Sequence, residues 1–180
     1  MRRTLPLLMA ITILAVGCGR LASDGQGNGP ATGGDPIDQR TIDVYAAAIR
    51  SLAGTEGWFD PILIDDRICA GAGDPMSETG DPCTDRFSAA EQTALLEALA
   101  DLPGVAFVDD AERVTQRIFD GKLQGAGLLA VGPIDGDGDR VEVPGEAYCG
   151  GLCGHWMTLV VESGPEGWTV SGTTGPVAIS

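Results

Sequence analysis

The chain has 180 residues, of which 11 are basic and 26 acidic, so its formal net charge is −15 at neutral pH. A surface this acidic repels phosphate backbones and anionic lipid headgroups, which disfavours nucleic-acid binding and a polybasic membrane contact. If the protein is held at a membrane, the attachment is therefore expected to come from a covalent lipid.

The first residues have the layout of an export signal. Two arginines precede an apolar run at residues 5–16, which is too short to span a bilayer stably, and a small residue precedes Cys18. Residues 15–18, Ala-Val-Gly-Cys, resemble the lipobox of bacterial lipoproteins, although that family most often has Leu where this chain has Ala. The resemblance implies a signal peptide at residues 1–17 and a palmitate-bearing Cys18 at the extracytoplasmic face of the cell membrane. The alternative is ordinary secretory cleavage with a spare cysteine.

Residues 18–39 are rich in Gly, Pro and Asp and contain almost no bulky apolar side chain. Such a segment cannot offset its ordering entropy by burial, so we expect a flexible tether with a coil dimension on the order of 25 Å. Residues 40–180 have the size of one ordinary domain, and we expect a single extracytoplasmic domain there.

Four further cysteines, an even set, are typical of disulfides in an exported chain, and they allow three pairings. Sequence proximity favours Cys69 with Cys83 and Cys149 with Cys153. The first pair closes a 15-residue ring, and the chain-entropy model predicts that this disulfide stabilises the folded protein by about 3 kcal/mol. The second pair has a rival interpretation, a dithiol redox site or a copper or zinc site completed by His155, but its C-x3-C spacing departs from that of common zinc sites.

Three helices are expected in the first part of the domain. Apolar residues at helical spacing predict one at residues 42–52, ended by Gly54. A capping box, Ser88 to Glu91, starts a second helix that runs to Leu102. Asp109 or Asp110 is expected to cap a third, which ends at Gly121.

The remaining segments predict strands. Two lie among the helices, at residues 61–69 and 105–108. Four more follow one another with short Gly-, Asp- and Pro-rich turns between them, at residues 128–134, 140–143, 155–161 and 168–173. Consecutive strands joined by short turns pair antiparallel, so we expect an α+β fold with the helices packed on one face of a mainly antiparallel sheet.

One acidic segment matches part of a calcium-binding loop. Its carboxylates occupy the first, third, fifth and twelfth positions of an EF-hand loop; they are Asp135, Asp137, Asp139 and Glu146. Arg140 replaces the glycine that the sharp turn requires, and Pro144 blocks the helix that should follow. A plain hairpin turn between two strands is therefore the favoured interpretation, with calcium as the alternative.

Catalytic patterns are weak. Any Ser/His/Asp triad would need His155, the single histidine, and no G-x-S-x-G elbow is present. Trp58, Trp156 and Trp168 are candidates for stacking a sugar or a peptide, but are expected to fill the core.

The last 33 residues of the chain, from Tyr148 onward, resemble the ends of actinobacterial lipoproteins, a resemblance that implies no activity. We therefore expect a non-catalytic, lipid-anchored domain that binds another envelope protein or a ligand. The alternative is a metal-binding envelope lipoprotein, with calcium at the acidic loop ahead of copper or zinc at Cys149, Cys153 and His155. An enzyme is the third possibility.

Overall fold

A computed structural model of the protein describes residues 37–54, 59–76 and 83–180, which belong to one compact unit. The predicted signal peptide, Cys18 and the tether up to residue 36 lie outside the described residues, as does Trp58. None of the described helices combines the length and the apolar composition that crossing a membrane requires.

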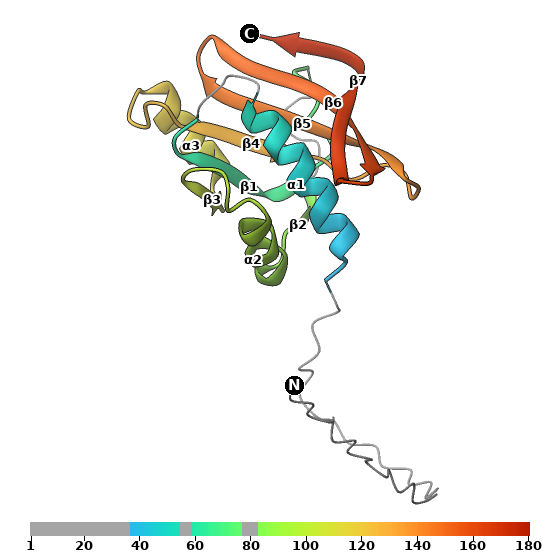
Figure 1. Cartoon of the computed structure of the whole chain (residues 1–180). Helices are drawn as coiled ribbons and strands as arrows, with labels where there is room; N and C mark the ends of the chain where they lie inside the picture. The colour runs from blue at the N-terminus through green and yellow to red at the C-terminus, as the bar shows by residue number, and fades with distance from the viewer. Residues whose placement is uncertain (1–36, 55–58, 77–82) are drawn as a thin grey trace, which may run out of the picture. The chain divides into compact units, whose positions relative to one another are not determined.

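The described residues form three helices and seven strands (Figure 1). In chain order these are α1 (Gln39–Gly54), β1 (Ile62–Cys69), β2 (Cys83–Arg86), α2 (Ala89–Ala98), β3 (Val105–Val108), α3 (Ala111–Phe119), β4 (Gly127–Val131), β5 (Arg140–Gly150), β6 (Cys153–Gly164) and β7 (Gly167–Ile179).

All seven strands belong to one sheet with the order β2-β1-β4-β5-β6-β7, and β3 also pairs with β1. β1 is parallel to β3 and to β4, whereas the other pairs are antiparallel. β3 pairs with the first half of β1 and β2 with its last residues, since Ile62 lies opposite Val105 and Arg67 opposite Arg86. The expected α+β class and the mainly antiparallel sheet are confirmed.

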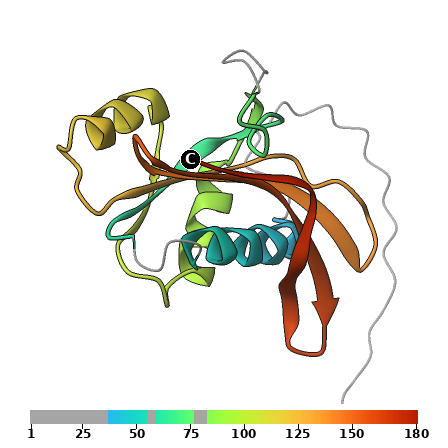
Figure 2. The same cartoon turned by 90° about the horizontal axis from the view of Figure 1, so that it is seen from above.

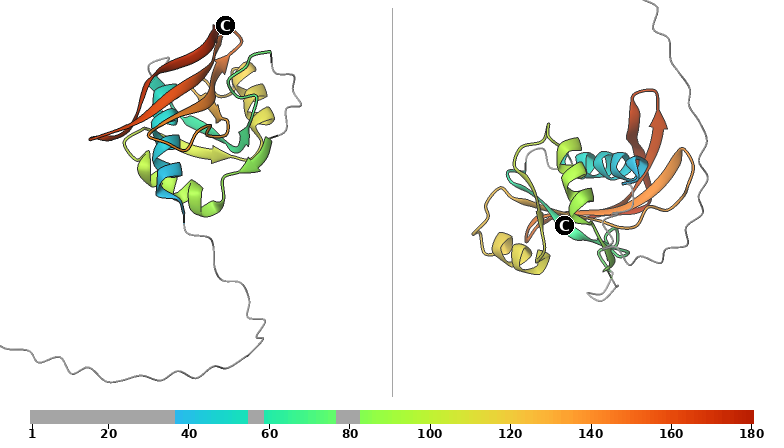
Figure 3. Two further views of the ribbon diagram at one scale, coloured as in Figure 1. Left: turned by 90° about the vertical axis from the view of Figure 1, so that its right-hand side faces the viewer. Right: turned by 90° about the horizontal axis from the view of Figure 1, so that it is seen from below.

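The helices do not share one face of the sheet, so that part of the prediction is wrong. α1 and α2 contribute to a large apolar core on one face, whereas α3 packs over a smaller core on the other, around Leu128 (Figure 2). Two crossover connections join the parallel strands. The first leads from β1 to β3 on one side of β1, and the second leads from β3 back past β1 to β4 on the other side. Right-handed crossovers in opposite directions place their helices on opposite faces, and the views in Figure 3 show the same arrangement.

The starts of α2 and α3 are formed as the sequence predicts. Ser88 Oγ accepts a hydrogen bond from the Glu91 N–H at 3.3 Å, and the Glu91 side chain accepts one from the Ser88 N–H at 2.8 Å. Asp110 is the residue that caps α3, because its carboxylate accepts from the Arg113 N–H at 2.9 Å. α1 begins at Gln39, within the segment assigned to the tether and three residues before the predicted start.

The last three strands are longer than predicted, and β2 was not predicted. β5 was expected to end before Pro144, yet it continues through this residue to Gly150. Pro144 lies one residue beyond the last β4–β5 ladder pair, Val131 with Gly145, where the missing N–H is tolerated. β5 and β6 are therefore paired over most of their lengths.

Candidate functional site

A cavity of about 730 Å³ lies on the face of the sheet that carries α3. Its floor is made by side chains of four neighbouring strands, β1, β4, β5 and β6. α3 forms one wall, and the segment that follows β1, together with the disulfide that closes it, forms another. The lining residues from the strands are Asp65, Arg67, Cys69, Leu128, Ala130, Glu146 and Trp156, and those from the walls are Gly71, Ala72, Asp74, Pro75, Cys83, Ala111, Glu112, Thr115 and Gln116.

Strand alternation explains why β1 presents charges to the cavity. Successive side chains of a strand point to opposite faces of the sheet. Ile62, Ile64 and Ile68 pack in or against the large core, so the residues between them, including Asp65 and Arg67, face α3. The apolar half of the strand secures the sheet, and the other half is available for polar contacts.

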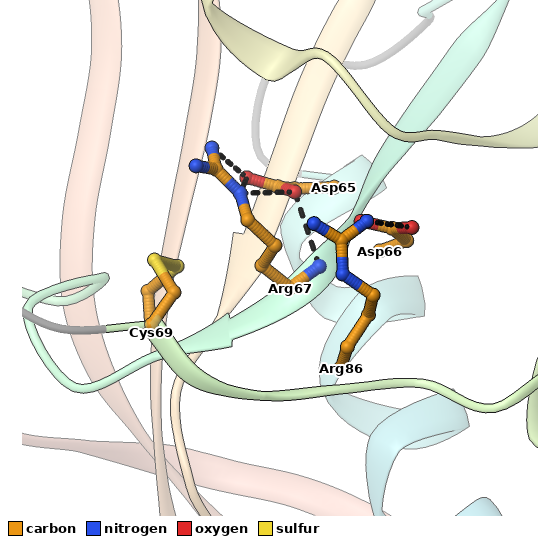
Figure 4. Close-up of a disulfide and its surroundings, with 6 residues drawn as sticks. Asp65, Asp66, Arg67, Cys69 and Arg86 are labelled. Carbon is orange, nitrogen blue, oxygen red and sulfur yellow. Dashed lines mark hydrogen bonds and ion pairs between the residues drawn. A yellow bond between two sulfur atoms is a disulfide. The ribbon is translucent and has the colours of Figure 1, made fainter.

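Asp65 and Arg67 form a closed ion pair on this floor (Figure 4). The Arg67 Nε donates to both oxygens of Asp65, at 3.0 and 3.2 Å, and Nη2 donates to Oδ2 at 2.9 Å. The Arg67 backbone N–H adds a further bond to Oδ1 at 3.1 Å. These bonds raise the pKa of Arg67. Asp65 is 3% exposed, and a carboxylate at that depth costs several kcal/mol unless its charge is paired.

The neighbouring Asp66 faces the other side of the strand and holds β2 in place. The Arg86 Nη1 donates to both of its carboxylate oxygens, at 2.8 and 2.6 Å, and the Phe87 N–H donates to its backbone carbonyl at 2.8 Å. Figure 4 shows the two ion pairs beside Cys69. The pairing of β2 with β1 thus supports the wall of the cavity that contains the Cys69–Cys83 disulfide.

The structure confirms both predicted disulfides. Cys69 is bonded to Cys83 and Cys149 to Cys153, with sequence separations of 14 and 4. The first joins the end of β1 to the start of β2, and both of its cysteines line the cavity. The second joins β5 to β6 across their connection, where it shapes a local turn.

Glu146 and Trp156 form the opposite part of the floor. They lie directly across from each other on β5 and β6, and the indole Nε1 donates to Glu146 Oε2 at 3.0 Å. Burial raises the pKa of Glu146, the hydrogen bond from Trp156 lowers it, and the charge of nearby Asp65 raises it further; the net shift is upward. This carboxyl group therefore holds its proton more tightly than an exposed glutamate.

The indole of Trp156 lies against Gly154, two residues earlier on β6. A Cβ added at Gly154 would lie 2.2 Å from Cη2 of Trp156, so only glycine leaves room for the ring to lie back along β6. With its N–H bonded to Glu146, the ring is fixed at both ends. Trp168, by contrast, packs against the large core with its ring 5.3 Å from the Arg40 guanidinium, as expected of a core residue.

The wall formed by α3 is polar where it faces the cavity. Glu112, Thr115 and Gln116 lie there, and the charge of Glu112 contributes to the raised pKa of Arg67. Gln116 Nε2 also donates to Asp120 at 2.8 Å. The helix itself is attached through three apolar residues, Ala111, Val114 and Ile118.

The predicted calcium ligands are not brought together, and within the described part of the chain no three His, Cys, Asp or Glu side chains are grouped to hold a metal. Asp135 opens the turn between β4 and β5, where its backbone exchanges two hydrogen bonds of 2.9 Å with Glu142. Glu146 lies on β5 instead, because the extended strand carries it about 20 Å beyond Arg140. The turn at Asp135 thus connects two antiparallel strands, β4 and β5, as in a hairpin.

The alternative copper or zinc site is also not formed. Both of its thiols are used in the Cys149–Cys153 disulfide, so neither is a thiolate ligand. His155 is buried in β6, opposite Ala147 of β5 and Ile179 of β7. The cavity on the α3 face is therefore the site from which function has to be argued.

Comparison of the chain with protein-family models, with curated proteins and with solved structures finds no match.

Proposed function

We propose that the protein is a lipid-anchored, extracytoplasmic binding protein whose cavity on the α3 face takes a small ligand. The observation that carries the proposal is a cavity of about 730 Å³ whose lining combines apolar side chains with the half-buried carboxylate of Glu146. Small-molecule sites typically occupy roughly 300–1,000 Å³ and combine apolar lining with a few placed polar groups. The resemblance of residues 15–18 to a lipobox supports the location.

The position of the cavity in the sheet supports a binding role as well. It lies beside the carboxyl end of β1, where the crossovers to β3 and β4 reverse direction. In sheets with parallel strands, ligands bind in the crevice at such a reversal. Glu146, on the floor of the cavity, receives its hydrogen bond from the neutral indole of Trp156, so a ligand could supply the charge compensation that this bond does not.

The lining favours binding over nucleophilic catalysis. Among the described residues that line the cavity there is no serine, histidine or free thiol, because Cys69 and Cys83 are bonded to each other. Asp65 has both oxygens engaged by Arg67, which leaves it poorly placed to accept a proton from a substrate.

The binding role predicts that blocking the cavity abolishes ligand binding. Thr115 lies on the wall formed by α3, partly exposed, so Thr115→Trp should fill the cavity without disturbing the sheet. We expect compounds from a small-molecule panel that raise the melting temperature of the full-length protein to lose that effect in the variant, by mass action. The exposed Thr93, on α2, gives the matched control Thr93→Trp. Ligands that stabilise both variants equally would show that the cavity is not the binding site.

The anchor predicts that Cys18 determines membrane association. Cys18→Ser should remove the acceptor of the lipid, so that the protein leaves the membrane fraction or stays unprocessed. The measurement is cell fractionation with metabolic labelling by palmitate. Normal labelling of the variant would contradict the assignment of the lipobox.

A further inference from the structure

The charges that line the cavity are strongly unbalanced. Among the lining residues that the structure describes, four carboxylates stand against one guanidinium, which is a net charge of −3 when all are ionised; they are Asp65, Asp74, Glu112 and Glu146, with Arg67. The chain as a whole carries −15. An anionic ligand would therefore be repelled both on approach and inside the cavity.

The single guanidinium is already occupied. Arg67 donates to Asp65 through Nε and Nη2, and its charge is balanced by a carboxylate that is 3% exposed. Withdrawing Arg67 to bind an anion would leave Asp65 buried and unpaired, at a cost of several kcal/mol. The pair is thus a closed unit that does not take part in ligand binding.

Glu146 is in the opposite situation. Its hydrogen bond comes from a neutral donor, the Trp156 indole, which satisfies one oxygen without neutralising the charge. Burial and the nearby Asp65 raise the pKa of Glu146, because both disfavour its ionised form. A cation placed beside the carboxylate would supply that compensation through a charge-assisted hydrogen bond.

Trp156 provides the second element of a cation site. Because Gly154 leaves room for the ring and Glu146 holds its N–H, the indole is oriented before any ligand arrives. A cation near the face of an indole is attracted by about 0.5–2 kcal/mol. Glu112 on α3 adds a further negative charge from the facing wall.

We propose that the ligand is a small organic cation, one that carries a primary ammonium or guanidinium group, and that this group is bound by Glu146 beside Trp156 with Glu112 on the facing wall. The proposal rests on the binding role of the cavity and specifies its ligand. An organic cation also suits the mixed lining, because Ala72, Pro75 and Leu128 offer apolar surface for its carbon chain.

The test is a charge series on one carbon skeleton. Putrescine, butanediol and succinate share a four-carbon chain and carry positive, neutral and negative groups, and isothermal titration calorimetry on the full-length protein in mild detergent compares their affinities. We expect putrescine to bind and the other two not to bind. Glu146→Gln keeps the shape of the side chain and should lower the affinity for putrescine by at least about tenfold. Glu112 lies on the exposed surface of α3, so Glu112→Gln should lower the affinity for putrescine by only about threefold.

A variant with the same change of charge separates site binding from general attraction to an acidic protein. Glu97 lies exposed on α2, on the other face of the sheet, so Glu97→Gln should leave the affinity unchanged. If the three glutamate variants bind putrescine equally, or if Glu146→Gln binds it as tightly as the unmodified protein does, the cation site is refuted. Equal melting temperatures of the variants establish that each is folded.

The dependence on pH gives an independent measurement. The charged groups that face Glu146 are Asp65 and Arg67 from β1, Asp74 from the following segment and Glu112 from α3. Since the cation needs an ionised Glu146, putrescine affinity should rise as pH increases through the raised pKa of this group. Glu146→Gln should remove most of that rise, and an unchanged profile in the variant would contradict the assignment.

The outcomes for the ligand class and for the binding role are distinguishable. If butanediol or succinate binds and Thr115→Trp blocks it, the cation proposal is overturned while the binding role is supported. If none of the three compounds binds, the cation proposal is overturned, and the panel with the Thr115→Trp variant still decides the binding role separately.

Discussion

Replacing Leu129 with alanine is expected to lower the free energy of unfolding by about 3–5 kcal/mol. Leu129 is 0% exposed and lies on β4, between β1 and β5 in the middle of the sheet. Its side chain faces the large core, where α1 and α2 cover the sheet. Neighbouring strands are hydrogen-bonded on both sides, so the backbone cannot move inward to fill the cavity that the shorter side chain leaves.

Urea denaturation followed by circular dichroism measures this loss. The matched control is Leu152→Ala, because Leu152 is 90% exposed in the turn between β5 and β6 and should change stability by less than about 0.5 kcal/mol. Similar losses in the two variants would mean that β4 is not the centre of the core.

The second large effect is expected from the disulfide that closes the cavity wall. Replacing both Cys69 and Cys83 with serine should cost about 3 kcal/mol, because the unfolded chain regains the freedom of a 15-residue ring. β2 is only four residues long and is held to β1 by this bond and by the Asp66–Arg86 ion pair. The variant should therefore also lose the pairing of β2 with β1. It should no longer bind the ligand of the cavity.

The other disulfide serves as the comparison. Cys149 and Cys153 close a ring of five residues, so the corresponding double serine variant should lose about 2 kcal/mol and keep the cavity intact. Thermal and urea unfolding of both variants, alongside the oxidised protein, distinguish the two effects. A larger loss for the short ring would contradict the chain-entropy account.

The parts of the fold that the sequence predicts well are those determined by neighbours in the chain. The capping box at Ser88 and the cap at Asp110 involve residues three apart, and the apolar spacing of α1 is visible within a few turns. The predicted order α, β, α, β, α followed by a meander was enough to obtain the α+β class. Both disulfides also followed from proximity along the chain.

What the sequence could not predict depends on pairing between distant segments. The position of α3 on its own face follows from β3 and β4 lying on either side of β1, which no local pattern reveals. β2 has only four residues and no alternating apolar pattern, so its strand character comes from its partner β1. Pro144 is tolerated in β5 because β4 ends beside it.

The candidate site was missed for the same reason, although two signals were present. Asp65, Asp66 and Arg67 interrupt an otherwise apolar strand, and acidic residues in such a strand need partners. Glu146 was counted by its spacing from Asp135 as a calcium ligand, whereas alternation along β5 places it on the face opposite Val143 and Ala147. Its partner Trp156 becomes visible only when β5 is aligned with β6.

The unequal size of the two cores has a consequence for motion. α3 is attached to the sheet by Ala111, Val114 and Ile118 alone among its buried residues, whereas nine residues of α1 are buried. Elements with few apolar contacts open locally at a lower free energy than the whole domain. Amide protons of α3 should therefore exchange with solvent through local opening, and those of α1 only when the domain unfolds. Since α3 is a wall of the cavity, this opening would also serve as the entrance, and a bound molecule would slow the exchange.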